Sequence, residues 1–176
     1  MQQQRYFIGM TLPSELSKAI ATVQHDIYIP DIMLLPLTPH ITLIEPNLLT
    51  MLPAEEFIPK VKDAASQFLP FTISLDQTSL FGKQVFYIDV KNEELAVLEM
   101  KLLKLLSDTT YGAVQINRPF QPHVTIAQAK YRQRLPLPLI ESLRTRIEPL
   151  LPQKFSVHEL VYFQWVHPRS YALYEI

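Results

Sequence analysis

The sequence predicts an α+β protein of two pseudo-symmetric lobes, each an antiparallel sheet with helices on its outer face, with a cleft between the sheets. Strand-like and helix-like segments are mixed in order, and short turns join most neighbouring strands. A pentapeptide occurs twice, nearly half the chain apart, as Pro39-His40-Ile41-Thr42-Leu43 and Pro122-His123-Val124-Thr125-Ile126. The 176 residues are 48% hydrophobic, which suits one domain over residues 1–176 in which the two lobes share a core.

Hydrophobic periodicity locates the elements of the first half. Residues 5–12 are predicted to form a strand that Pro13 closes, and Ser14 is a candidate N-cap for the helix that follows. Three prolines predict an irregular connection over residues 28–39, which leads into the first motif strand at residues 37–44. A helix is expected over residues 53–68, with a late start or a kink at Pro59.

The second half repeats this alternation. Residues 71–75 and 85–90 are predicted to pair as a hairpin, with the turn near residues 81–84. Leucines at helical spacing predict a helix over Glu93–Ser107. The second motif strand is expected to end near residue 127, and a further helix lies within residues 137–150. Residues 155–166 and 170–176 are predicted to form a closing hairpin.

The repeated pentapeptide places a histidine and a threonine on the same face of a strand, because side chains alternate along an extended chain. His40 and Thr42 form one such half-site, and His123 and Thr125 form the other. The aliphatic residues between them point the opposite way, into a core. Two half-sites of this kind facing one another would give a pair of proton-transfer groups, which we interpret as an active site.

Composition excludes several classes of function. There is no cysteine, so disulfides, thiolate catalysis and thiolate zinc sites are excluded. The net charge of -1 argues against a basic nucleic-acid coat protein. No run of 18 apolar residues predicts a membrane span, and residues 1–5 lead into a strand-like run rather than a signal peptide, so we expect a cytoplasmic protein.

The net charge is close to zero, but the charged residues are unevenly distributed along the chain. Between residues 118 and 146 the only acidic residue is Glu141, whereas the basic residues are Arg118, Lys130, Arg132, Arg134, Arg144 and Arg146. This stretch contains the second motif, so it indicates either a phosphate-bearing substrate or a merely solvated surface.

The doubled His-x-Thr motif, in a chain of this length, resembles the 2H phosphoesterase superfamily, whose best-known branch contains 2′-5′ RNA ligases and 2′,3′-cyclic phosphodiesterases. The resemblance extends over nearly the whole chain. It includes the opening Tyr6-Phe7-Ile8-Gly9, the strands around Phe81 to Val90, and Phe120-Gln121-Pro122-His123-Val124-Thr125.

The resemblance implies a metal-independent phosphodiesterase without cofactor that hydrolyses 2′,3′-cyclic phosphates of RNA ends or small nucleotides, with reversible 2′-5′ ligation as a further reaction. Its catalytic residues would be His40, Thr42, His123 and Thr125. We expect a monomer. Phosphate and base contacts are predicted from nearby cations and aromatic rings, of which the principal candidates are Arg118, Lys130, Phe81, Phe120 and Tyr6, with Tyr131, Tyr162 and Trp165 as further rings.

Two alternatives remain. A non-catalytic RNA- or nucleotide-binding module could keep the same fold, although such a module would not need two imidazoles. A metal site could combine the motif histidines with Glu45, Asp89 or His158, but the chain lacks a His-x-His, a Glu-x-x-His or a compact carboxylate cluster.

Overall fold

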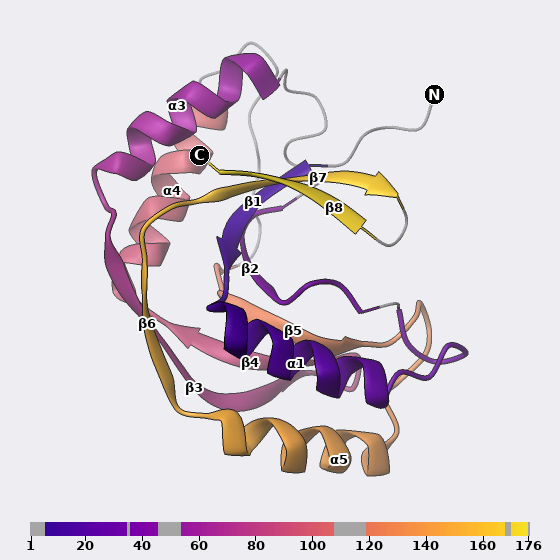
Figure 1. Ribbon diagram of the computed structural model, residues 1–176. Helices are drawn as coiled ribbons and strands as arrows, with labels where there is room; N and C mark the ends of the chain where they lie inside the picture. The colour runs from indigo at the N-terminus through magenta and orange to yellow at the C-terminus, as the bar shows by residue number, and fades with distance from the viewer. Residues whose placement is uncertain (1–5, 35, 46–53, 108–118, 168–169, 176) are drawn as a thin grey trace.

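A computed structural model of the chain describes residues 6–34, 36–45, 54–107, 119–167 and 170–175 (Figure 1). Within these residues the chain forms four α-helices and eight strands, which confirms the predicted α+β class. The helices are α1 (Ser14–Asp26), α3 (Ala54–Ser66), α4 (Glu93–Ser107) and α5 (Leu137–Ile147), the last followed by a 3-10 turn, η1 (Glu148–Leu150). The strands are β1 (Tyr6–Thr11), β2 (His40–Ile44), β3 (Phe71–Phe81), β4 (Val85–Lys91), β5 (His123–Gln128), β6 (Gln153–Val157), β7 (Val161–His167) and β8 (Ser170–Glu175).

The strands pair in the order β6-β3-β4-β5-β2-β1-β7-β8, and each pair is antiparallel. The expected two sheets are therefore the two halves of one curled sheet, with four strands in each half (Figure 1). The halves meet where β2 pairs with β5. The two motif strands consequently lie side by side at the centre of the sheet.

The helices connect the two halves. Helix α1 follows β1 in one half but contacts β5 and α5 in the other, and α4 follows β4 but contacts β2 and α3. Figure 1 shows the pair α1 and α5 at one end of the molecule and the pair α3 and α4 at the other. Each half of the sheet is thus covered in part by a helix that follows a strand of the other half.

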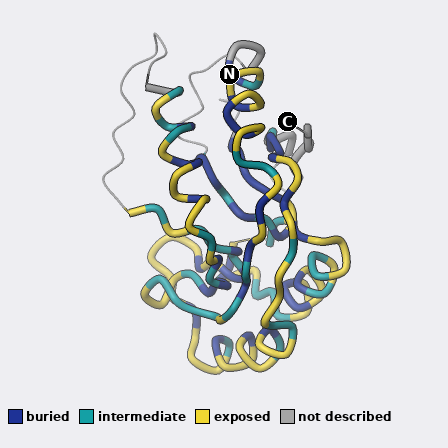
Figure 2. Tube along the Cα trace, turned by 90° about the vertical axis from the view of Figure 1, so that its left-hand side faces the viewer, coloured by how far each residue is buried: buried dark blue, intermediate teal, exposed yellow. Residues whose placement is uncertain are grey.

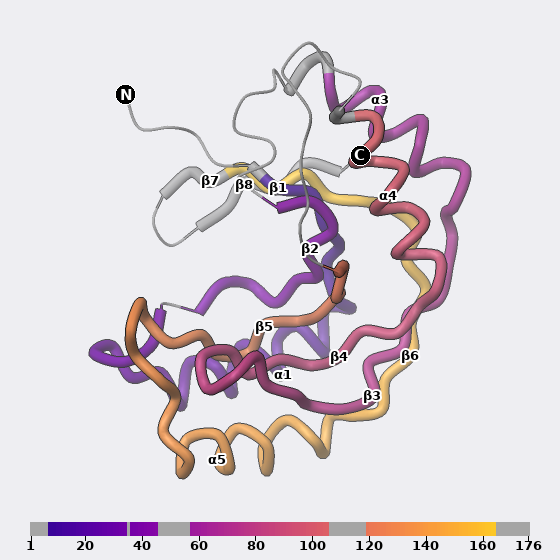
Figure 3. Tube along the Cα trace, turned by 180° about the vertical axis from the view of Figure 1, so that it is seen from behind, coloured from indigo at the N-terminus to yellow at the C-terminus, as the bar shows by residue number. Residues whose placement is uncertain are grey.

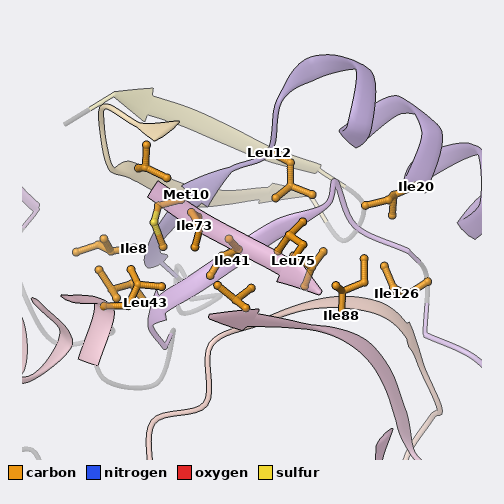
Figure 4. Packing of buried hydrophobic residues seen from close by; sticks show 14 of the residues in the cluster. Ile8, Met10, Leu12, Ile20, Ile41, Leu43, Ile73, Leu75, Ile88 and Ile126 are labelled. Carbon is orange, nitrogen blue, oxygen red and sulfur yellow. The ribbon is translucent and has the colours of Figure 1, made fainter. Parts of the chain in front are cut away.

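One contiguous cluster of buried side chains joins both halves. It includes Ile8 and Ile41 from one half, Ile88 and Ile126 from the other, and Ile20 from α1 (Figure 4). Exposed residues lie mainly on the outer sides of helices and in connections (Figure 2). No helix in the described part of the chain is long and apolar enough to cross a membrane.

Helix α4 shows how local sequence and packing agree. Its N-terminus is capped by Asn92, whose side-chain oxygen accepts a hydrogen bond from the Leu95 N–H at 3.0 Å. Leu95, Leu98 and Leu102 recur at helical spacing and are fully buried. The predicted bounds of this helix are confirmed.

Two predicted details of the other helices are wrong. Ser14 is the first residue of α1 rather than its cap; the cap position is taken by Pro13, which makes no side-chain capping bond. Of the late start or kink predicted at Pro59, the late start does not occur, because α3 begins at Ala54 and includes this proline. Pro59 is the sixth residue of α3, where a proline removes one backbone hydrogen bond and crowds the carbonyl four residues earlier, yet the helix continues through it.

The predicted strand over residues 155–166 is two strands. The chain leaves the β-structure after Val157 and resumes it at Val161, and β6 pairs with β3 whereas β7 pairs with β1. These partners lie in opposite halves of the sheet. Leu160, in the break, is buried like Val161 at the start of β7, so the apolar run does not reveal where the chain crosses the sheet.

Candidate active site

The two motif strands are direct neighbours. Ile41 of β2 and Val124 of β5 are partners in the antiparallel pairing, and both are fully buried. Because side chains alternate along a strand, the residues that flank this pair point to the other face. These are the four predicted catalytic residues, all of which are partly exposed: His40, Thr42, His123 and Thr125.

Each motif strand also carries the same irregularity. Along β1 and β2, Ile8 pairs with Ile44 but Gly9 pairs with Thr42, so Leu43 is an extra residue. Along β4 and β5, Phe86 pairs with Ala127 but Tyr87 pairs with Thr125, so Ile126 is extra. Both are β-bulges at the residue directly after the motif threonine. The bulge explains why two successive residues are buried after each threonine.

Close packing beside β2 depends on a glycine. A Cβ atom on Gly9 would collide with the carbonyl oxygen of Ile41, a backbone atom that cannot turn aside. The absence of a side chain therefore lets β1 lie against the strand that carries His40 and Thr42. Tyr87 occupies the corresponding position beside β5, where it pairs with Thr125.

Both imidazoles are held by the backbone in the same way. The Nδ1 atom of His40 lies 2.7 Å from the Thr38 carbonyl oxygen, and Nδ1 of His123 lies 2.8 Å from the Gln121 carbonyl oxygen. A carbonyl only accepts, so Nδ1 carries a proton and donates it in each case. The Nε2 atom is then the nitrogen through which each ring would accept or donate a proton.

Stacked aromatic rings contact each histidine. The His40 ring lies 4.8 Å from Phe7 and 5.3 Å from Phe163, which stack on each other at 4.3 Å between centroids. Phe7 and Phe163 are almost fully buried. This side of the site is therefore apolar.

The rings beside His123 differ in kind. Phe81 and Tyr87 stack at 4.0 Å, and their centroids lie 5.0 Å and 5.2 Å from that of His123. Phe81 is partly exposed, whereas Tyr87 is buried. The Gln121 side-chain amide donates a hydrogen bond to the Tyr87 hydroxyl oxygen at 2.9 Å. The residue whose carbonyl holds His123 is therefore itself held by a neighbouring strand.

The two imidazoles interact electrostatically. Burial is the largest cause that lowers the pKa of His40 from the usual 6.5, and the nearby His123 lowers it further. The hydrogen bond to the Thr38 carbonyl opposes these effects, because it favours the protonated ring. His40 is consequently neutral at pH 7, and its protonation depends on the charge of His123.

Gln24 is a residue of the site that the sequence analysis did not identify. Its side chain is 2% exposed, and its amide donates hydrogen bonds to the carbonyl oxygens of Thr125 and Ile126 at 3.3 Å and 3.1 Å. These carbonyls flank the bulge in β5. Helix α1 thus supports the second motif strand from about 100 residues away in sequence. The available signal was a polar residue on the apolar stripe formed by Ile20 and Val23.

Of the five predicted substrate-binding residues, the structure describes the side chains of Phe81, Phe120 and Lys130. Phe81 lies beside His123, and Phe120 is partly buried against the core. Lys130 is exposed in the connection that follows β5, and no described contact joins it to the four motif residues. Tyr6 begins β1, but its side chain lies outside the described residues, as does Arg118.

No group of three histidine, aspartate or glutamate side chains among the described residues lies close enough together to hold a metal ion. Asp89 pairs with His123 across β4 and β5 and accepts a hydrogen bond from Gln77 at 3.1 Å. His158 is exposed between β6 and β7.

The sequence pattern of the 2′-5′ RNA ligase superfamily matches residues 12–168. The chain belongs to this superfamily, the 2H phosphoesterases that its paired motifs resemble. Among curated proteins, the "Putative phosphoesterase" of Bacillus pumilus (strain SAFR-032) is 34% identical over 119 residues. That match covers 66% of each chain, slightly less than two thirds.

Solved structures share the fold of this 2H phosphoesterase. TT0787 of Thermus thermophilus superimposes with a TM-score of 0.67 at 20% identity, over 98% of this chain and 94% of that one. E. coli LigT complexed with 3′-AMP gives a TM-score of 0.65 at 20% identity, over 98% and 95%. Other structures of LigT contain NADP+ or ATP. At such identity these likenesses establish the fold alone.

Proposed function

We propose that this chain is a metal-independent phosphodiesterase that hydrolyses 2′,3′-cyclic phosphates on RNA ends or small nucleotides. The observation that carries the proposal is the pairing of Ile41 with Val124, which places His40 and His123, each with a threonine two residues later, on one face of two adjacent central strands. Two imidazoles in one site supply both proton transfers of a phosphodiester hydrolysis. Membership of the 2H phosphoesterases supports the same reaction class.

The reaction needs one base and one acid. The base takes a proton from water as its oxygen attacks phosphorus, and the acid gives a proton to the ribose oxygen whose bond to phosphorus breaks. We assign the base to His40, because its lowered pKa keeps it neutral at pH 7. His123 is then the acid. With a ribose hydroxyl in place of water as the nucleophile, the same pair would join that hydroxyl to the cyclic phosphate, with His40 again as the base and His123 as the acid.

The threonines would stabilise the negative charge that develops on the non-bridging phosphate oxygens. Thr42 and Thr125 lie on the same face as the imidazoles, and their hydroxyls can donate hydrogen bonds to the two non-bridging oxygens. Such donors are effective because the strands hold them in place before the reaction begins. The β-bulge beside each threonine gives both the same backbone setting.

A nucleotide is the natural ligand for this arrangement. Phe81 is partly exposed beside His123 and can stack on a base. Phe120 and Tyr6 remain predicted base contacts, and Arg118 and Lys130 remain predicted phosphate contacts. Structures of LigT complexed with 3′-AMP, NADP+ and ATP support nucleotide binding here. The proposal places the enzyme in the cytoplasm, as a monomer without cofactor.

Incubation with a 2′,3′-cyclic nucleotide in the presence of EDTA tests the proposal. We expect release of a nucleoside monophosphate at an unchanged rate, since no step uses a metal. Turnover that EDTA abolishes would contradict the metal-independent mechanism. Binding without turnover would instead identify the rival function, a non-catalytic RNA- or nucleotide-binding module.

A further inference from the structure

A positively charged surface lies beyond the end of β5. It consists of Lys83, Lys130, Tyr131, Arg132 and Arg134, and we call it the β5–α5 surface. All five residues are exposed, and Tyr131 is 85% exposed, the most of any large hydrophobic residue in the described chain. The Arg132 guanidinium lies 5.1 Å from the centre of the Tyr131 ring. An aromatic ring among cations is the combination that binds single-stranded nucleic acids.

The cations of this surface differ from those of the adjacent helix in their ion pairs with other described residues. On α5, Arg144 forms an ion pair with Glu148 and Arg146 forms one with Asp26. Within the described residues, none of the four cations of the β5–α5 surface forms an ion pair. The neighbouring connection between α1 and β2 carries one acidic residue among its described residues, Asp31, which forms none of these ion pairs. The basic stretch between residues 118 and 146 therefore separates into a neutralised helix and an unneutralised loop.

The loop is fixed against its neighbours. Ala129 and Leu135 donate backbone hydrogen bonds to Gln84 and Lys83 of the β3–β4 turn, at 2.7 Å and 2.8 Å. Lys130 donates one to Ile32 at 2.8 Å. Figure 3 shows the segment after β5 beside the connection that precedes β2. The five side chains thus project from a supported backbone rather than a loose loop.

Arg132 occupies a position that suits glycine better. A turn closed by the Gln133 N–H and the Lys130 carbonyl at 2.8 Å holds Arg132 at φ 66°, in the left-handed region. The left-handed conformation costs an ordinary residue roughly 1–2 kcal/mol, and glycine nothing. An arginine here is therefore not explained by backbone stability.

The surface continues from the proposed active site. Phe81, whose ring centre lies 5.0 Å from that of His123, is the last residue of β3, and Lys83 follows it by two residues in the β3–β4 turn. At about 3.3 Å per residue, the end of β5 lies roughly 16 Å from His123 along the strand. A ligand that reaches both places must extend beyond the terminal nucleotide.

We infer that the β5–α5 surface binds the single-stranded RNA that precedes the terminal cyclic phosphate, so that the preferred substrate is an oligoribonucleotide rather than a mononucleotide. This inference rests on the proposed function. Phosphates would contact the four cations, and a base would stack on Tyr131.

The test compares kcat/KM for 2′,3′-cyclic AMP and for a short oligoribonucleotide ending in a 2′,3′-cyclic phosphate. Wild type should prefer the oligoribonucleotide. Tyr131→Ala should lower the ratio of kcat/KM for the oligoribonucleotide to kcat/KM for 2′,3′-cyclic AMP roughly tenfold, because a stacked base is lost. In the double variant Arg132→Gly, Arg134→Gln, the slope of the logarithm of the oligonucleotide binding constant against the logarithm of the salt concentration should become less negative by about 1.4, or ~0.7 for each cation removed. Arg132→Gly alone should keep or raise thermal stability, since glycine suits the left-handed position.

The matched control is Arg144→Gln, Arg146→Gln, which removes the same charge from the neutralised helix and should leave the ratio unchanged. Equal kcat/KM for the two substrates in wild type, or a double variant with unaltered ratio and salt dependence, would overturn the inference. If neither substrate is hydrolysed, the proposed function fails, and binding of an oligoribonucleotide ending in a 3′-phosphate still decides the inference. Weaker binding by the variants than by the control supports it, and equal binding overturns it.

Discussion

The half of the site around His40 and the half around His123 have the same backbone arrangement but differ in the side chains that surround the histidine. Each histidine lies on a central strand, donates Nδ1–H to the carbonyl two residues earlier, and precedes a bulge at the same position of its motif. Even the order of buried and partly exposed residues is the same over the first five residues of β2 and β5. The backbone of one half is thus repeated in the other.

The side chains around the two rings are not repeated. His40 lies against the buried pair Phe7 and Phe163, and its pKa is lowered mainly by burial. His123 lies beside the partly exposed Phe81 and beside Tyr87, whose hydroxyl holds Gln121. The repeated backbone therefore sets the positions of the two imidazoles, whereas the aromatic residues distinguish them. We expect this difference to determine which ring is base and which is acid.

Replacing either histidine should produce the largest effect. His40→Ala and His123→Ala each remove one proton-transfer group, so kcat/KM for a 2′,3′-cyclic nucleotide should fall by ~10²–10⁴-fold. The double variant should lose less than the product of the single losses, because both groups serve one transition state. His158→Ala, which changes an exposed histidine, is the matched control and should retain wild-type activity. Full activity in either motif variant would mean that this half is structural.

Replacing the threonines tests whether the two halves contribute alike. Thr42→Val and Thr125→Val keep the branched shape that suits a strand but remove a donor to the developing charge. By analogy with other oxyanion donors, we expect losses of up to ~10²–10³-fold in kcat/KM. Similar losses would extend the symmetry of the backbone to catalysis. Wild-type rates in both variants would show that the hydroxyls do not contact the reacting phosphate.

Gly9→Ala should break the packing of the His40 half alone. The added Cβ meets the Ile41 carbonyl, so β1 and β2 must separate, and we expect a loss of about 3 kcal/mol in the free energy of unfolding. Denaturant unfolding measures this loss. Gly82→Asn is the control, because Gly82 lies in an open turn at φ 58°, which asparagine tolerates. Unchanged stability in Gly9→Ala would show that the close approach of the strands is not required.

Gln24→Leu should weaken the His123 half alone. The variant removes both side-chain donors to the Thr125 and Ile126 carbonyls, so we expect a loss of about 2 kcal/mol in the free energy of unfolding. Backbone amide chemical shifts should change along β5 more than along β2. His25→Ala, an exposed neighbour on the same helix, should alter neither. A variant as stable as wild type would mean that the bulge does not need this support.

Much of the fold could be predicted because its elements have strong periodicity. Leucines at helical spacing fixed the bounds of α4, and the repeated pentapeptide identified both motif strands. The buried Ile41 and Val124 followed from alternation along a strand. These are local properties that a short window of sequence contains.

The features that could not be predicted depend on partners distant in sequence. Two successive apolar residues, Leu43 and Ile44, interrupt the alternation after Thr42, but only the pairing with β1 identifies this interruption as a bulge. Gln24 resembles an ordinary polar residue in a helix until Thr125 and Ile126 lie beside it. The break between β6 and β7 likewise follows from which strand each one joins.

The pKa of His40, followed by NMR of its imidazole during a pH titration, tests the central claim that the two halves form one asymmetric acid–base pair. We predict that His40 in the wild-type protein titrates below 6.5, because burial and the charge of His123 both disfavour its protonated form. In His123→Ala the repulsion is absent, so the pKa of His40 should rise. The acid limb of the kcat/KM profile should coincide with the wild-type pKa of His40, since protonation of the base stops the reaction. A His40 that titrates at or above 6.5, with a pKa unmoved by His123→Ala, would contradict the account.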